Sequence, residues 1–181
     1  MKNQFRGAAI LMGMLVSGAA FCGNSVPAGT KGAGGVVEFS GEIVDVSCNV
    51  SSVNGGNKVD LGKWAISYFT GTSTETTKTP FNISVDNCPT SVTDVAVLLD
   101  GQKDATDPTL LAVTGGATGV GIKLYNGGAS GSQINLGTVS ASVPVTSGKA
   151  TVPFFADYKS TGGSITSGDA NGVANFLMVY N

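Results

Sequence analysis

Residues 152–158 read VPFFADY. Their even-numbered positions are all apolar, and this period-two alternation predicts a β-strand with one buried face. The odd-numbered side chains, Asp157 among them, are therefore expected to lie on the solvent-facing side of the strand. Pro153 has no amide hydrogen to offer a sheet, which predicts an edge strand or a bulge at this point.

The same alternation recurs along the chain, and no window shows apolar residues at helical spacing. Glycine accounts for 27 of the 181 residues and, with Ser, Thr, Asn and Asp, fills the gaps between short apolar runs, as turn residues do. Short strands at such intervals predict an antiparallel all-β sandwich or barrel. The runs are 37–43, 59–61, 81–85, 92–99, 120–125 and 173–180, with weaker ones at 110–113, 133–136 and 143–145.

The N-terminus has the pattern of a secretory signal peptide over residues 1–22. Lys2 and Arg6 precede an apolar stretch of about a dozen residues that ends in small side chains. Cleavage after Cys22 would start the mature chain at Gly23, and cleavage two residues earlier would start it at Phe21. The first is preferred because it discards one of three cysteines and leaves a pair, although lipidation of Cys22 is a further alternative.

The two remaining cysteines, Cys48 and Cys88, are expected to form one disulfide in an oxidising compartment. On the chain-entropy model, a bridge that closes a loop of roughly forty residues is worth roughly 4 kcal/mol. Residues 23–181 suffice for one domain with a hydrophobic core.

Charge and residue types narrow the class of protein. The chain carries 10 basic and 12 acidic residues, and two of the basic ones fall in the signal peptide. No basic patch that would bind nucleic acid or an anionic membrane is therefore expected. It has no histidine, which removes the commonest general base and zinc ligand. Asp100, Asp104 and Asp107 share one loop but lack the spacing of a calcium loop. The sequence predicts no enzyme, no metal and no cofactor.

Residues 23–36 differ in composition from the rest. They are rich in glycine and carry only small apolar side chains, too little to offset the entropy of ordering them alone. Taken alone, the composition favours a disordered leader. On one parity the segment carries small side chains: Val26, Ala28, Thr30, Gly32, Gly34 and Val36.

Four segments, in this order behind a signal peptide, resemble the major pilins of type 1 and related chaperone–usher fimbriae. Residues 34–48 are similar to the opening strand that leads to the family's first cysteine, and residues 81–88 to the strand that leads to its second. Residues 152–158 also match. The most specific segment is the C-terminus, with Gly168 followed by alternating Ala174, Phe176, Met178 and the penultimate Tyr180.

The resemblance implies an immunoglobulin-like β-sandwich over residues 37–181 that lacks its last strand. A periplasmic chaperone would fill the resulting groove first. At an outer-membrane usher, the next subunit would then insert residues 23–36 as a donor strand, with backbone hydrogen bonds giving affinity and alternate side chains giving register. Gly168 and the strand ending at Tyr180 would serve chaperone and usher recognition. The product is a surface fimbrium for adhesion, built from identical or related subunits.

Two alternatives share the signal peptide, strands and disulfide. One is a minor adaptor subunit of the same fimbria. The other is a monomeric secreted carbohydrate-binding sandwich, which would present an exposed aromatic platform. The single tryptophan, Trp64, is expected instead to pack against its surroundings.

Overall fold

The computed structural model describes residues 36–41, 47–53 and 57–181, within two units, Met1–Glu42 and Ile43–Asn181. In the first unit, residues 36–41 have no regular secondary structure, and the side chains of Val36, Val37 and Phe39 are exposed. Most of the predicted signal peptide and leader lies outside the described residues. Within the described ranges no helix is long and apolar enough to cross a membrane.

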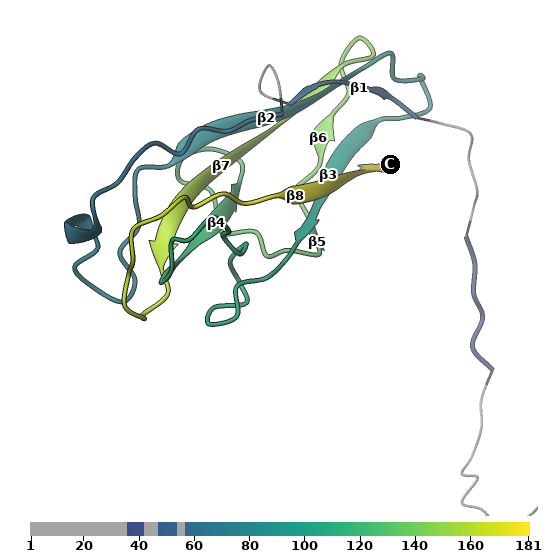
Figure 1. The fold of residues 1–181 in the computed structure, drawn as a ribbon. Helices are drawn as coiled ribbons and strands as arrows, with labels where there is room; N and C mark the ends of the chain where they lie inside the picture. The colour runs from purple at the N-terminus through teal and green to yellow at the C-terminus, as the bar shows by residue number, and fades with distance from the viewer. Residues whose placement is uncertain (1–35, 42–46, 54–56) are drawn as a thin grey trace, which may run out of the picture. The chain divides into compact units, whose positions relative to one another are not determined.

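The second unit is an all-β sandwich of two sheets (Figure 1). The first sheet has the order β1 (Asn49–Val53), β2 (Thr79–Asp86), β7 (Ala150–Ser160) and β4 (Val120–Asn126). In the second, β3 (Asp94–Gly101) pairs with β5 (Thr138–Val139) and β6 (Val143–Pro144) on one side and with β8 (Ala174–Tyr180) on the other. All of these pairs are antiparallel. A single 3-10 turn, η1 (Ile66–Tyr68), interrupts the described loops.

The core lies between the sheets and is built by the predicted alternation. In β7, Val152, Phe154 and Ala156 are buried, and the ring of Phe154 stacks on that of Phe81 in β2 with centroids 5.3 Å apart. β3 contributes Val95, Val97 and Leu99 from the other sheet. Residues 59–61, 110–113 and 133–136 form no named strand, although Leu111 and Gln133 make isolated bridges to β4.

Two predictions for β7 were wrong. The strand is interior, between β2 and β4, rather than at an edge. It accommodates Pro153 because β4 ends at Asn126, opposite Phe154, and the Pro153 carbonyl instead accepts a hydrogen bond from Gly127 N at 3.1 Å. The missing amide therefore falls on the side where the ladder has already ended. Asp157 is not exposed to solvent as predicted: its side chain is completely buried.

Candidate functional site: the C-terminal strand and its open edge

β8 is paired on one edge only. It aligns with β3 over seven residues, from Val95 opposite Tyr180 to Gly101 opposite Ala174. Within residues 47–53 and 57–181, β8 has no strand on its other edge, so the backbone groups along that edge are free to pair with a further strand.

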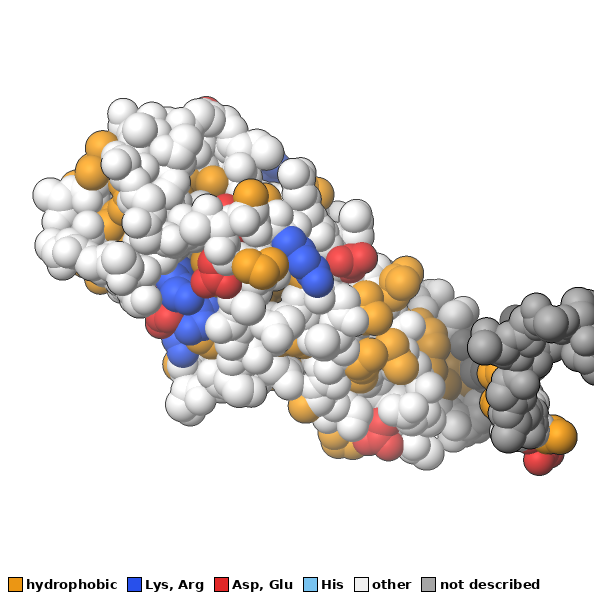
Figure 2. Space-filling view, turned by 90° about the horizontal axis from the view of Figure 1, so that it is seen from below, with side chains coloured by type: hydrophobic (Ala, Val, Ile, Leu, Met, Phe, Trp, Pro, Cys, Tyr) orange, Lys and Arg blue, Asp and Glu red, His pale blue; other side chains and the backbone are white. Residues whose placement is uncertain are grey.

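The core-facing side chains of β8 are only half covered. Ala174, Phe176, Met178 and Tyr180 pack against the core but are partly exposed. The large ones face buried partners on β3: Val97, opposite Met178, is 0% exposed, and Leu99, opposite Phe176, is 3% exposed. The cover over the hydrophobic core therefore ends at β8. In the space-filling view, hydrophobic side chains gather toward the end of the sandwich at which β8 finishes (Figure 2).

The opposite face of β8 is also apolar. Leu177 is 66% exposed, and Val173, just before the strand, is 78% exposed. Leu177 pairs with Leu98, which in turn pairs with Val139 on the far side of β3, so three apolar side chains line up across the outer surface of this sheet.

The C-terminal end of β8 is anchored to the sandwich. At its C-terminal end, Asn181 N donates to Asp94 O at 3.0 Å, and Asn181 O accepts from Thr93 N at 2.8 Å. The Tyr180 hydroxyl donates to the carbonyl oxygen of Cys48 at 3.4 Å, and Cys48 forms the predicted disulfide with Cys88. These contacts hold the open edge in one position, next to the start of the first sheet.

Gly168 lies before β8 rather than within it. A Cβ atom at this position would stand 2.4 Å from both Ala117 N and Gly116 C, which is closer than real Cβ atoms approach backbone. The neighbouring Asp169 bridges to Gly116. Glycine is therefore required here for the close passage of two backbone segments.

The structure brings together four of the five predicted C-terminal residues on one face of β8. Of the six predicted donor residues, Val36 is described and is 98% exposed. The other five, Val26, Ala28, Thr30, Gly32 and Gly34, lie outside the described residues. Sequence reasoning did not single out the half-buried residues that also pack on the core: Val53, Val59, Leu61, Val113, Val143 and Val145. Val53 belonged to no predicted run, and the others belonged to the runs 59–61, 110–113 and 143–145.

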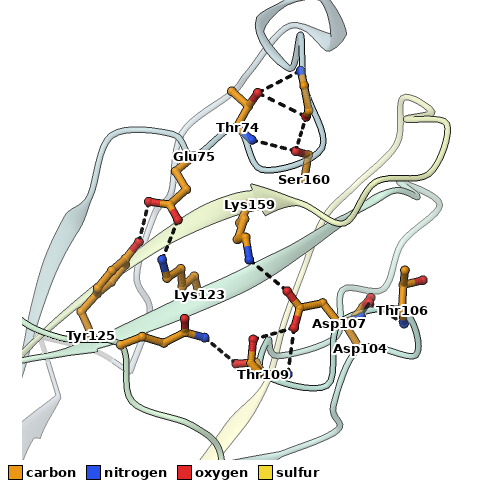
Figure 3. A network of polar contacts seen from close by, with 12 residues as sticks. Thr74, Glu75, Asp104, Thr106, Asp107, Thr109, Lys123, Tyr125, Lys159 and Ser160 are labelled. Carbon is orange, nitrogen blue, oxygen red and sulfur yellow. Dashed lines mark hydrogen bonds and ion pairs between the residues drawn. The ribbon is translucent and has the colours of Figure 1, made fainter.

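A polar cluster covers the outer face of the first sheet, away from β8 (Figure 3). Lys123 Nζ lies 2.5 Å from Glu75 Oε1, and Lys159 Nζ lies 3.0 Å from Asp107 Oδ2. Burial opposes ionisation of Glu75, but the hydrogen bond and charge of Lys123 outweigh it and lower the pKa of that carboxyl.

The predicted acidic loop is organised by its own turns. The Thr109 hydroxyl, helped by Lys159, lowers the pKa of Asp107 against the effect of burial. Asp104 accepts hydrogen bonds from the amides of Thr106 and Asp107, both at 2.9 Å. Two of the three acids therefore stabilise the loop that carries them.

The aromatic side chains near Trp64 form a small cluster rather than a flat platform. Trp64 Nε1 donates to Leu61 O at 2.7 Å, and its ring lies 4.8 Å from that of Tyr68, tilted by 54°. This arrangement agrees with the expectation that Trp64 packs against its surroundings.

Comparison with known proteins identifies the family. The model of the family described as "Fimbrial protein" matches residues 37–181. The chain is 33% identical to a type 1 fimbrial subunit of Salmonella typhimurium, over 99% of this chain and 100% of that one. It is 34% identical to the type-1 fimbrial protein A chain of Salmonella typhi, over the same shares.

Solved structures agree on the fold. The P pilus rod subunit PapA superposes with a TM-score of 0.63 at 20% identity, covering 74% of this chain and 99% of that one. The type I fimbria protein of Burkholderia pseudomallei gives a TM-score of 0.57 at 28% identity, covering 78% and 91%. The sandwich is thus immunoglobulin-like, and the chain belongs to the fimbrial protein family as a structural pilin subunit of a surface fimbrium.

Proposed function

We propose that this pilin polymerises by strand addition, with residues 23–36 of one subunit lying along the free edge of β8 in the next. The observation that carries the proposal is the contrast between two neighbouring rows of side chains, one on β3 and one on β8. The inner row of β3 is buried, whereas the inner row of β8, directly beside it, is half exposed. A strand added beyond β8 would cover that row and satisfy the free backbone groups.

The donor segment is suited to such a site by its small side chains. Val26, Ala28, Thr30, Gly32, Gly34 and Val36 would face Phe176, Met178 and Tyr180, which are large. Small side chains opposite large ones fill a shallow groove without overpacking it. If this exposed row stayed uncovered, the subunits would aggregate through it. A periplasmic chaperone is therefore proposed to cover the row before assembly, and an outer-membrane usher to be the place where the donor strand of the next subunit replaces the chaperone. Residues 1–22 would direct export and be removed in its course.

The test is deletion of residues 23–36. A subunit without its donor segment is expected to accumulate as soluble chaperone complex and to form no fimbriae. A synthetic peptide of residues 24–38, added to that complex, is expected to displace the chaperone and raise the melting temperature sharply. The same peptide with Gly34→Trp serves as the matched control and is expected to do neither.

Normal fimbriae from the deleted chain would contradict strand donation. A stable monomer with neither chaperone nor peptide present would favour a monomeric binding module instead.

A further inference from the structure

A carboxyl group is buried on the outer face of the first sheet. Asp157 lies in β7 opposite Lys123 of β4, on the face that points away from the core, and yet it is 0% exposed. The Tyr125 hydroxyl of β4 contacts it, and the Glu75 carboxyl of the segment 70–78 reaches the same hydroxyl. Residues 74–76 pair with β7 just after Asp157: Thr76 N donates to Tyr158 O at 2.9 Å, Ser160 N donates to Thr74 O at 3.0 Å, and Glu75 forms a bridge with Lys159.

One phenol hydroxyl stands between two carboxyl groups. The Tyr125 oxygen lies 2.9 Å from Asp157 Oδ2 and 3.1 Å from Glu75 Oε2. A phenol has one hydrogen and can donate it to only one of these oxygens. Asp157 Oδ1, also buried, has no hydrogen-bond partner among the described residues. If both acids were ionised, the phenol oxygen would face one of the two carboxylate oxygens with no hydrogen between them.

The nearby positive charges are directed elsewhere. Lys123 binds Glu75, and Lys159 binds Asp107. Lys78 Nζ lies 3.7 Å from the centroid of the Tyr125 ring and donates to Ala129 O at 2.9 Å. Burial, reinforced by the charge of Glu75 and opposed by Tyr125, Lys123 and Lys78, raises the pKa of Asp157 to about 6. Burial also raises the pKa of Tyr125, which keeps its hydrogen.

We propose that Asp157 is the proton-binding group of a latch that holds residues 70–78 on the sheet. Protonated Asp157 donates to the Tyr125 oxygen, which frees the phenol hydrogen for Glu75, whose other oxygen accepts from Lys123. Each hydrogen between Asp157, Tyr125, Glu75 and Lys123 then has one acceptor. When Asp157 loses its proton to solvent, the phenol hydrogen turns back to Asp157, and Glu75 is held by Lys123 alone.

The direction of the pH effect follows from linkage. The folded-state pKa of Asp157, about 6, exceeds its ordinary value of 3.8, so the closed form binds more protons than the open form between these values. The latch is therefore tightest in mild acid and loosens as the pH rises through about 6. Two pKa units correspond to a change of about a hundredfold in the opening equilibrium.

Hydrogen exchange of assembled fimbriae tests the proposal, read out by mass spectrometry on the peptide that contains residues 70–78. After correction for intrinsic rates, protection at about pH 5 is expected to exceed that at about pH 7.5, by up to about a hundredfold. Asp157→Asn keeps a neutral donor at this position and should give high protection at both values. The matched control Asp100→Asn, an exposed carboxylate on β3, should keep the pH dependence of the unmodified chain.

Equal protection at the two pH values in the unmodified fimbria would overturn the proposal, as would an unchanged pH dependence in Asp157→Asn. If that variant fails to assemble, difference infrared spectroscopy of the unmodified fimbria replaces it. A carboxylic-acid carbonyl band that disappears between about pH 5 and about pH 7 is expected. Its absence would mean that Asp157 is ionised throughout, which excludes the latch.

Discussion

The hydroxyl of Tyr180 lies 3.4 Å from the carbonyl oxygen of Cys48, so the penultimate residue of the chain is joined to the disulfide near the start of the domain. The ring of the same tyrosine belongs to the half-exposed row on β8. Tyr180 therefore links the two parts of the fold between which a further strand is proposed to enter.

Two substitutions at Tyr180 are expected to distinguish the contribution of its hydroxyl to stability from that of its ring. Tyr180→Phe removes one long hydrogen bond and should cost no more than about 1 kcal/mol. Tyr180→Ser also removes the ring from the core edge, which should cost about 3 kcal/mol and leave little subunit in the cell. Immunoblots of chaperone-bound subunit compare the two. Equal yields would mean that the ring contributes nothing to the fold or to chaperone capture.

The two faces of β8 offer a matched pair of variants. Met178→Ser, on the inner row, is expected to abolish fimbriae, because it removes an apolar contact both from the core and from the proposed donor strand. Leu177→Ser, on the adjacent and 66% exposed position, should leave strand addition intact. Electron microscopy of the cell surface and chaperone binding in vitro measure the outcome. Loss of chaperone binding in Leu177→Ser but not in Met178→Ser would reverse the assignment of the faces.

Cys48→Ser is expected to destabilise the subunit by roughly 4 kcal/mol, because the bridge to Cys88 closes a loop with a sequence separation of 40 residues. Yield of chaperone-bound subunit should fall accordingly. Denaturant unfolding of fimbriae with and without reductant provides the second measurement. Coincident midpoints for the oxidised and reduced forms would show that the bridge does not stabilise the assembled subunit.

Gly168→Ala is expected to destabilise the domain by about 1–3 kcal/mol, because its Cβ would overlap the backbone of Gly116 and Ala117. The control is Gly163→Ala, where an added Cβ meets nothing within 4 Å. Melting temperatures of the two variant subunits in complex with chaperone give the comparison. If Gly168→Ala melts normally but is no longer assembled, the glycine serves recognition rather than packing.

The Asp107–Lys159 pair predicts a loss of stability in acid. The pKa of Asp107 is held below its ordinary 3.8, so the pair stabilises the fold above that pH and the contribution disappears as the pH falls through the lowered value. Since the pair is partly exposed, its contribution should be about 1 kcal/mol or less. Asp107→Asn should reduce the acid-induced drop in melting temperature below about pH 4, and Asp100→Asn should not.

Much of the fold follows from local pattern. Period-two alternation in residues 81–85, 92–99, 120–125 and 152–158 predicts strands that the structure contains, and their apolar parity matches the buried face. The Cys48–Cys88 bridge follows from cysteine count and an expected oxidising compartment. The alternation of Ala174, Phe176, Met178 and Tyr180 likewise matches the face of β8 that packs on the core. These features depend on residues close in sequence, where side-chain direction is set by the backbone itself.

The burial of Asp157, the tolerance of Pro153 inside a sheet and the role of Gly168 could not be read from the pattern. Asp157 is buried beside Tyr125 of β4, whose hydroxyl also reaches Glu75 of a distant segment, and Pro153 is tolerated because β4 stops one residue short of it. Gly168 is required because residues 116–117, some fifty positions earlier, pass within contact distance. Each depends on where a distant segment comes to rest, and alternation along one strand carries no information about what lies above it.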